Sequence, residues 1–321
     1  MRLIFPASFM AAILLLSGMY QLAYAEPVFT SRTYKMPDSI SAAVEIVHRD
    51  SKTSGGFSTL WVSPDCESLI TISDYSQSSK RGDLNRSAWF EANILYDEAG
   101  NLSGVSYIRS GQLTGLDGKT VPGAVEAMAW DGQGFLIAFD DRGQIYRYAG
   151  SSPSGDVFAN KPVVVYEGKN LAVGNAGLES LAVLPDGRIF ALWEKDEWSN
   201  EAVAWLISKQ QTQSFIYEGE ANPGGATTLA DGSLLVLERQ FYSIFSGIQV
   251  RLVQVPQEAL GGSDKVLKGK VLFDVTSMSL DNFEGLSACR KDNRQIVFAI
   301  SDNNGDWDGS QETLLIMIEL E

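Results

Sequence analysis

The feature that most constrains the fold is one hairpin pattern that occurs five times along the chain. Each copy has an apolar strand, a tight turn at an aspartate and a second apolar strand that ends in an acid. The five copies read GFSTLWVSPDCESLITISD (56–74), EAMAWDGQGFLIAFD (126–140), ESLAVLPDGRIFALWE (179–194), GGATTLADGSLLVLE (224–238) and EGLSACRKDNRQIVFAISD (284–302). A supersecondary unit that recurs in this way is typical of a repeat architecture.

Two further alternating strands follow each of the first four hairpins, and one follows the fifth. They read NILYD and GVSYIRS, QIYRY and VVVYE, AWLIS and SFIYE, IQVRLVQV and KVLFDV, and finally TLLIMIEL. Four antiparallel strands per unit, at a period of roughly 40–60 residues, indicate an all-β fold of the β-propeller type. We expect five four-stranded blades, with the missing last strand supplied by the N-terminal segment Ala42–Val47. A ring of six blades remains an alternative.

The first 25 residues have the features of a secretory signal peptide. Arg2 precedes a short apolar run, and Ala23-Tyr24-Ala25 forms an A-x-A cleavage site. The apolar run is shorter than the ~20 residues that a membrane-spanning helix needs. We therefore expect cleavage near Ala25, a single propeller domain over residues 26–321, and an exported, periplasmic or secreted monomer without a membrane span.

Charge and metal-ligand content exclude several classes of function. The chain has 25 Lys and Arg against 40 Asp and Glu, a formal net charge of −15, and no basic block. Nucleic acid is therefore not an expected partner, because phosphate neutralisation needs clustered cations. His48 is the single histidine, which excludes a metal site built from several histidines.

The two cysteines fit the predicted closure of the ring. Cys66 lies in the turn of the first hairpin, and Cys289 ends the first strand of the fifth. In a closed ring the first and last blades are neighbours, and both positions fall on the same face. We expect a disulfide between them, as suits an oxidising compartment. Two buried free thiols are the alternative.

The acids of the hairpins predict one functional surface. The start of a hairpin's first strand lies beside the end of its second, and the inner strands of a propeller line the central channel. We therefore expect one mouth of the channel to be surrounded by Asp74, Glu126, Asp140, Glu179, Glu194, Glu238, Glu284 and Asp302. Their repulsion favours a bound cation, and oxygen ligands without histidine or thiolate favour Ca²⁺. Acids that merely cap strand edges are the alternative.

Three cations, Lys195, Arg239 and Arg142, are predicted at the same mouth. Lys195 and Arg239 directly follow the strand-ending acids Glu194 and Glu238. A mixed ring of acids, metal and a few cations suits a small anionic substrate, with phosphate bridging calcium and guanidinium. Simple charge balance within an acidic rim explains each cation equally well.

An ordered set of motifs resembles the bacterial phytase-like domain family, named for an esterase-like activity of phytase. The motifs are EAMAW from Glu126, GLESLAVLPDG from Gly177, LLVLERQF from Leu234, NFEGL from Asn282, ISDNN from Ile300 and TLLIMIEL from Thr313. The resemblance extends over nearly all of residues 43–321. It implies an exported propeller related in shape to the calcium-dependent β-propeller phytases, and phosphoester hydrolysis by metal-activated water.

The resemblance also implies roles for particular residues. Glu179, Glu238 and Arg239 are the predicted catalytic residues, with Arg239 contacting phosphate. Together with the ring of hairpin acids, which adds Asp74 and Glu194, the predicted calcium ligands are Asp74, Glu126, Glu194, Glu284 and Asp302.

Three functions remain open at this point. The leading one is a calcium-dependent phosphomonoesterase acting on a small phosphate ester. The second is a lactone or carboxylester hydrolase, because calcium polarises a carbonyl equally well. The third is a non-catalytic propeller whose calcium is structural and whose rim binds a partner.

Overall fold

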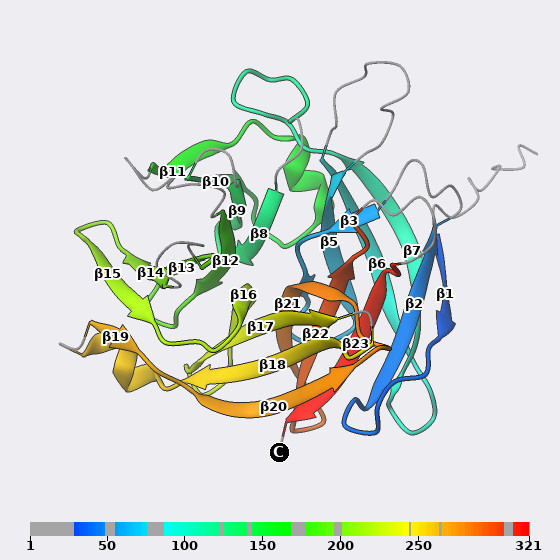
Figure 1. Ribbon diagram of the computed structural model, residues 1–321. Helices are drawn as coiled ribbons and strands as arrows, with labels where there is room; N and C mark the ends of the chain where they lie inside the picture. The colour runs from blue at the N-terminus through cyan, green and yellow to red at the C-terminus, as the bar shows by residue number, and fades with distance from the viewer. Residues whose placement is uncertain are drawn as a thin grey trace, which may run out of the picture.

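The chain forms five mainly antiparallel sheets around one axis (Figure 1). The computed structural model describes residues 29–48, 55–75, 87–121, 125–139, 143–167, 177–195, 201–243, 245–262, 265–304 and 311–320. The arrangement confirms the predicted all-β propeller and decides between five and six blades in favour of five. The predicted signal peptide lies outside the described residues.

The first four blades follow the chain from the innermost strand outward. Blade one contains β3 (Gly55–Phe57), β4 (Trp61–Val62), β5 (Ser68–Tyr75), β6 (Ala88–Tyr96) and β7 (Leu102–Gln112). Blade two contains β8 (Val125–Trp130), β9 (Gly134–Phe139), β10 (Gln144–Ala149) and β11 (Val163–Glu167). Blade three contains β12 (Leu178–Val183), β13 (Ile189–Trp193), β14 (Ala202–Ile207) and β15 (Thr212–Tyr217). Blade four contains β16 (Asn222–Thr228), β17 (Leu234–Ser243), β18 (Gly247–Val255) and β20 (Lys270–Ser277).

Blade five combines the two ends of the chain. It contains β21 (Asn282–Lys291), β22 (Arg294–Asp302), β23 (Leu314–Leu320), β2 (Ala42–His48) and β1 (Phe29–Thr33). The pairing of β2 with β23 confirms the predicted closing strand. The outer strand β1 was not predicted. It also touches β7 of blade one, where the Ser31 hydroxyl accepts a hydrogen bond of 2.8 Å from the Val105 amide.

Each blade packs both of its faces against neighbours. Five separate apolar clusters lie in the described residues, one at each interface between adjacent blades. The second strand of a hairpin is therefore buried on both faces. In β9 all six residues, Gly134–Phe139, are buried, and in β13 all five are. This explains why these strands read as continuous apolar runs instead of alternating ones.

The hairpin turns repeat one local geometry. The carboxylates of Asp131, Asp186 and Asp231 each accept a hydrogen bond from the backbone N–H two residues further on. The glycine that follows each of these aspartates has a φ of 81–82°, in the left-handed region that glycine adopts without a Cβ penalty. In blade one this position is Cys66, whose φ is 62°.

Two short 3₁₀ helices and one short strand complete the described structure. The helices are η3 (Gly155–Ala159) and η4 (Gln257–Gly261). Strand β19 (Val266–Leu267), from the connection between β18 and β20 of blade four, pairs parallel with β15 of blade three. No helix within these ranges has the length and apolar character needed to cross a membrane.

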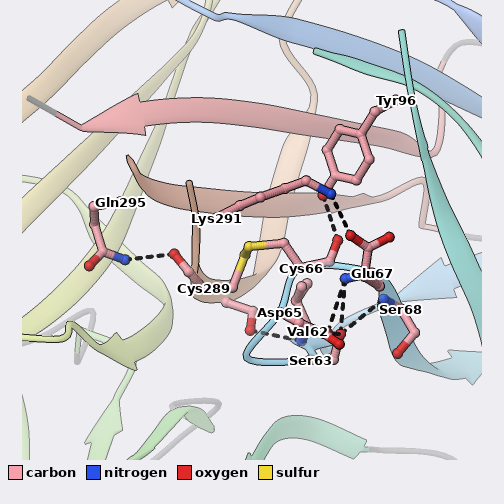
Figure 2. Close-up of a disulfide and its surroundings, with 11 residues drawn as sticks. Val62, Ser63, Asp65, Cys66, Glu67, Ser68, Tyr96, Cys289, Lys291 and Gln295 are labelled. Carbon is pink, nitrogen blue, oxygen red and sulfur yellow. Dashed lines mark hydrogen bonds and ion pairs between the residues drawn. A yellow bond between two sulfur atoms is a disulfide. The ribbon is translucent and has the colours of Figure 1, made fainter. Parts of the chain in front are cut away.

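The joint between the first and last blades carries the predicted disulfide. Cys66 and Cys289 are bonded, with their Cα atoms 5.5 Å apart (Figure 2). Beside them the Lys291 ammonium of β21 forms a 2.5 Å ion pair with Glu67 and lies 4.0 Å from the centroid of the Tyr96 ring, both in blade one. Covalent, ionic and cation–π contacts thus hold the two ends of the ring together.

Removal of the disulfide should weaken ring closure without abolishing the sheets. We expect the double variant Cys66→Ser/Cys289→Ser to lose about 2–4 kcal/mol of unfolding free energy, because the bond constrains the unfolded chain. Urea unfolding with and without reductant measures the effect. Reductant should lower the stability of the wild type to that of the variant and leave the variant unchanged. A wild type that is fully reduced yet equally stable would contradict the prediction.

Candidate functional site

A β-bulge occurs at the same place in the inner strand of every blade. The strand register shifts by one residue at Glu126 in β8, at Glu179 in β12, at Gly224 in β16 and at Glu284 in β21. Blade one has the same shift between β3 and β4, within residues 58–60. Because a bulge leaves one residue out of the ladder and redirects its side chain, the three glutamates leave the pattern of alternate faces.

The bulged glutamates meet in the central channel. A narrow cavity of about 10 Å³ is lined by residues of all five blades, including Ser58, Glu126, Glu179, Gly225 and Glu284. That volume is about the room of one water molecule. The prediction that acids at the start of the hairpins converge on the channel axis is thus realised for these three glutamates.

The fourth blade contributes a cation in place of a carboxylate. Its bulged residue is Gly224, and a Cβ placed there would lie 2.9 Å from Arg239 Nε and 2.9 Å from the carbonyl oxygen of Phe283. The absence of a side chain therefore leaves room for the Arg239 guanidinium to pass over the inner strand. Three blades supply glutamate to the channel, and blade four supplies arginine.

Arg239 is held between carboxylates of blades three and five. Its Nη2 lies 2.9 Å from Glu284 Oε1 and 4.0 Å from Glu179 Oε2, and its Nη1 donates a hydrogen bond to the Asn282 side-chain oxygen. The Asn282 amide in turn donates to Glu284 Oε1 at 2.8 Å. Burial lowers the pKa of Arg239, but Glu284 and Glu179 outweigh burial and raise it. The guanidinium is therefore a fixed positive charge.

Two buried aspartates lie behind this group on blade five. Burial, and after it the charge of Glu284, raises the pKa of Asp302 to about 7. The 2.7 Å hydrogen bond that Asp302 Oδ1 accepts from the backbone N–H of Asn304 lowers the pKa, but by less. Burial likewise raises the pKa of Asp281 to about 6. Hydrogen bonds from the backbone amides of Glu312 and Asn282 lower this pKa but do not cancel the effect of burial. These two carboxyl groups therefore bind protons more tightly than exposed ones do.

Other predicted residues lie at the same mouth with different partners. Glu194 Oε1 accepts a weak 3.5 Å hydrogen bond from the Asn222 amide, and its charge also raises the pKa of Arg239. The Lys195 ammonium donates to the carbonyl of Gly219 at 3.0 Å. The side chain of Asp74, a predicted calcium ligand, and all of Asp140 and of Arg142 lie outside the described residues.

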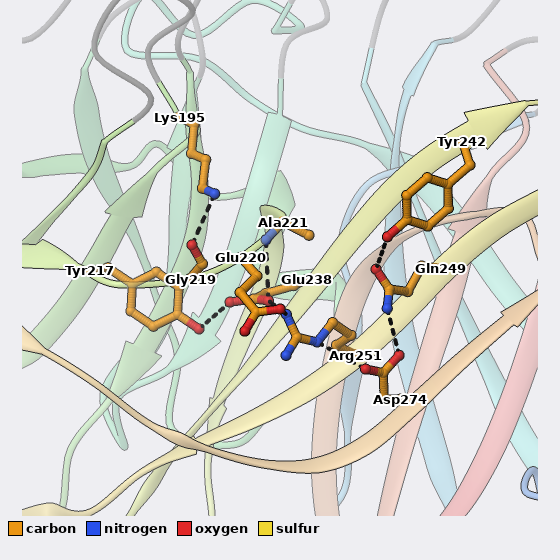
Figure 3. A network of polar contacts seen from close by, with 10 residues as sticks. All are labelled: Lys195, Tyr217, Gly219, Glu220, Ala221, Glu238, Tyr242, Gln249, Arg251 and Asp274. Atoms are coloured by element: carbon orange, nitrogen blue, oxygen red, sulfur yellow. Dashed lines mark hydrogen bonds and ion pairs between the residues drawn. The ribbon is translucent and has the colours of Figure 1, made fainter.

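Glu238, one of the predicted catalytic residues, lies among different partners from those of Arg239. Successive residues of a strand point to opposite faces, so Glu238 of β17 turns away from the channel and into the interface with blade three. It is completely buried, accepts a 2.8 Å hydrogen bond from the Tyr217 hydroxyl and lies 3.3 Å from Arg251 Nη1 (Figure 3). Arg251 also pairs with Glu220 and Asp274. This network joins blades three and four.

Asp281 was not among the residues predicted at this mouth, whereas the sequence predicts its neighbour Asn282 as a neutral oxygen ligand for calcium. Asn282 contacts both Arg239 and Glu284, and Asp281 lies beside it. A sequence signal existed in the run Asp281-Asn282-Phe283-Glu284, where polar residues interrupt an otherwise apolar inner strand. Polar groups at such a position need a partner when they are buried.

The residues at the mouth match calcium in ligand type but not in placement. Carboxylate and amide oxygens are the ligands that Ca²⁺ prefers. Within the described ranges, however, no three acidic, histidine or cysteine side chains lie close enough together to hold a metal ion. The Arg239 guanidinium lies between Glu179 and Glu284. Four carboxylates (Glu179, Glu194, Glu284 and Asp302) act electrostatically on this cation.

The raised pKa of Asp302 predicts a dependence of stability on pH. The folded state binds this proton more tightly than the unfolded state, so unfolding free energy falls as the pH rises from about 4 to about 7. We expect Asp302→Asn to reduce the loss of unfolding free energy between pH 5 and pH 8. Urea unfolding with a chelator present measures it, with the exposed Glu258→Gln as control. An unchanged loss in Asp302→Asn would contradict the assignment.

The buried Glu238–Arg251 pair predicts a strong asymmetry between single and double variants. Arg251→Met would leave Glu238 buried without its cation, and we expect a loss of about 3–5 kcal/mol of unfolding free energy. The double variant Arg251→Met/Glu238→Leu removes both charges and should recover most of that loss, because isosteric apolar replacement of a buried pair is often neutral. Equal losses in the two variants would show that the charges do not act as a pair.

Comparisons with solved structures find propellers that are only distantly similar. The allergen Mala s 1 of Malassezia sympodialis has 14% identity, a TM-score of 0.45 and coverage of 92% of each chain. An exo-1,5-α-L-arabinanase from a bovine ruminal metagenomic library has 10% identity, a TM-score of 0.46 and coverage of 85% of this chain and 95% of its own. The RS223 β-xylosidase has 8% identity, a TM-score of 0.48 and coverage of 84% and 93%. Likenesses this distant carry no argument about activity.

The comparison with family models identifies a family, which the comparison with solved structures does not. No curated protein matches the sequence. The family described as "Phytase-like: Esterase-like activity of phytase" matches residues 52–305, which include all five hairpins and the bulged glutamates. The chain therefore belongs to the phytase-like family.

Proposed function

We propose that this chain is an exported hydrolase of phosphate esters that works at the carboxylate mouth of the channel with Ca²⁺ as cofactor. The observation that carries the proposal is the convergence of Glu126, Glu179 and Glu284 on one channel, with Arg239 among them. Membership of a family described by an esterase-like activity supports hydrolysis as the reaction class. The disulfide is consistent with export.

Arg239 would bind the phosphate group of the substrate. A guanidinium has five N–H donors, and its described contacts engage Nη1 with Asn282 and Nη2 with Glu284. A phosphate with two or more acidic oxygens competes well for such donors, because charge-assisted pairs of this kind are strong. Both partners fix the position of the guanidinium. The side chain therefore loses little further conformational entropy when substrate binds.

Glu179 would remove the proton from the attacking water. Its carboxylate lies further from the guanidinium than that of Glu284, at 4.0 Å against 2.9 Å, and it lines the same narrow channel. The water oxygen forms the new bond to phosphorus while the ester oxygen leaves and takes up a proton. Asp302, with its pKa raised to about 7, can carry that proton near neutral pH.

Calcium would be held by carboxylates of this mouth that were predicted as its ligands. Among the described residues these are Glu126, Glu194 and Glu284, while Asp302, also predicted as a ligand, is here assigned the proton instead. When bound, the ion would offset phosphate charge and lower the pKa of a water molecule. Support comes from the convergence of carboxylates on the channel and from the oxygen ligands that the residues described there offer.

Phosphate release by the mature protein tests the proposal. The protein is first treated with a chelator, and calcium is then titrated with p-nitrophenyl phosphate, phytate and p-nitrophenyl acetate as substrates. We expect phosphate release that rises and saturates with calcium. Hydrolysis of p-nitrophenyl acetate, or of a lactone, that is faster than hydrolysis of the phosphate esters would instead favour a carboxylester hydrolase. No turnover of any substrate, by folded protein at every calcium level, would favour a non-catalytic propeller.

Two variants test the assigned residues. Glu284→Gln and Arg239→Gln should each lower kcat/KM by about 100-fold or more, because each removes a charge at the reacting group. Glu258→Gln makes the same chemical change on the exposed surface of η4 and should have no effect. Circular dichroism shows whether each variant keeps its fold. Full activity in a folded Glu284→Gln protein would overturn the site.

A further inference from the structure

A second and larger cavity opens at the opposite mouth of the channel. It has a volume of about 510 Å³, within the usual range for small-molecule sites. Residues of all five blades line it, and the wall includes Trp61, Trp130, Val183, Leu229 and Leu286. Cys289 of the disulfide is part of the same wall, so the cavity lies on the side of the hairpin turns and not beside the carboxylates.

The charge of this cavity is the reverse of the charge of the chain. The protein has 40 Asp and Glu and a net charge of −15. Yet none of the residues lining the cavity is acidic, and the single charged one is Arg290. Its side chain is exposed and forms no ion pair within the described ranges. A positive charge therefore borders an otherwise neutral wall.

The polar groups of the wall are largely engaged in contacts between neighbouring elements. The Ser287 hydroxyl accepts a hydrogen bond from the Val62 amide at 2.9 Å, and the Thr228 hydroxyl donates to the Val183 carbonyl at 2.9 Å. The Gln295 amide donates to the Cys289 carbonyl at 3.0 Å. The surface offered to a ligand is therefore mainly apolar, with one cation at its edge.

The aromatic part of the wall is held rigidly from behind. Trp61 and Trp130 both pack edge-on against Phe135, with ring centroids 5.5 Å and 4.9 Å apart. Phe135 is itself completely buried. A cavity whose walls are fixed in this way loses little conformational entropy when a ligand enters.

We propose that this cavity binds a small apolar molecule that carries one anionic group, such as a medium-chain carboxylate. The alkyl or aromatic body would lie against the two tryptophans and the aliphatic wall. The anionic group would pair with the Arg290 guanidinium. Polyanions and sugars fit poorly, because the wall has one cation and few uncommitted hydrogen-bonding groups. The site is separate from the carboxylate mouth and does not depend on the proposed hydrolysis.

Calorimetric titration with decanoate and decanol tests the site. The two probes share an alkyl chain and differ in charge. Wild-type protein should bind decanoate saturably and more tightly than decanol. Arg290→Gln should weaken decanoate binding about fivefold, the effect of one exposed ion pair, and leave decanol binding unchanged. Arg188→Gln alters another arginine on the turn side, outside the wall, and should change neither.

Further measurements keep the site distinct from the catalytic mouth. Glu284→Gln, which changes the other mouth, should bind decanoate like the wild type. A bulky variant of the wall, Ala230→Trp, should block both probes. The inference is overturned if decanoate does not bind saturably, or if Arg290→Gln binds it as tightly as the wild type does. Loss of decanoate binding in Glu284→Gln would also overturn it, because the ligand would then occupy the carboxylate mouth.

Discussion

Every blade of this propeller buries both of its faces against its neighbours, and the rest of the structure depends on that constraint. Five apolar clusters, one at each blade interface, provide the packing. An open ring would leave two blade faces in water, at about 25 cal/mol for each Å² of apolar surface. The pairing of β2 with β23 and the Cys66–Cys289 disulfide are therefore what make the other contacts possible, because they close the ring.

The same constraint determines how charge can reach the channel. An inner strand packed on both faces has no free face for a carboxylate, so a regular strand would place each acid inside an interface. The repeated bulge resolves this conflict by taking one residue out of the ladder. Glu126, Glu179 and Glu284 reach the channel in this way. Glu238 lies in a regular part of β17, and it is accordingly buried between blades and compensated by Arg251.

Features that depend on composition and on the order of motifs can be predicted from this sequence. Features that depend on a shift of one residue in strand pairing cannot. Five hairpins, the closing strand Ala42–Val47 and the cysteine pair follow from repeated patterns. The bulges do not, because a one-residue shift leaves the apolar pattern on either side nearly intact. The separation of Glu238 from Arg239 has the same origin, since the two residues are adjacent in the sequence but face opposite sides of the blade. Strand β1 has too few apolar residues to be recognised.

The closed ring also separates two kinds of chemistry along one axis. At one mouth the bulges place carboxylates around Arg239, where burial and mutual repulsion keep Asp302 partly protonated near neutral pH. At the other mouth the hairpin turns engage their aspartates with backbone amides and arginines, as Asp186 is engaged by Arg188. The wall between the turns contains no acidic residue, and Arg290 is its single charged residue. A strongly acidic chain thereby presents a surface on which an anion is not repelled.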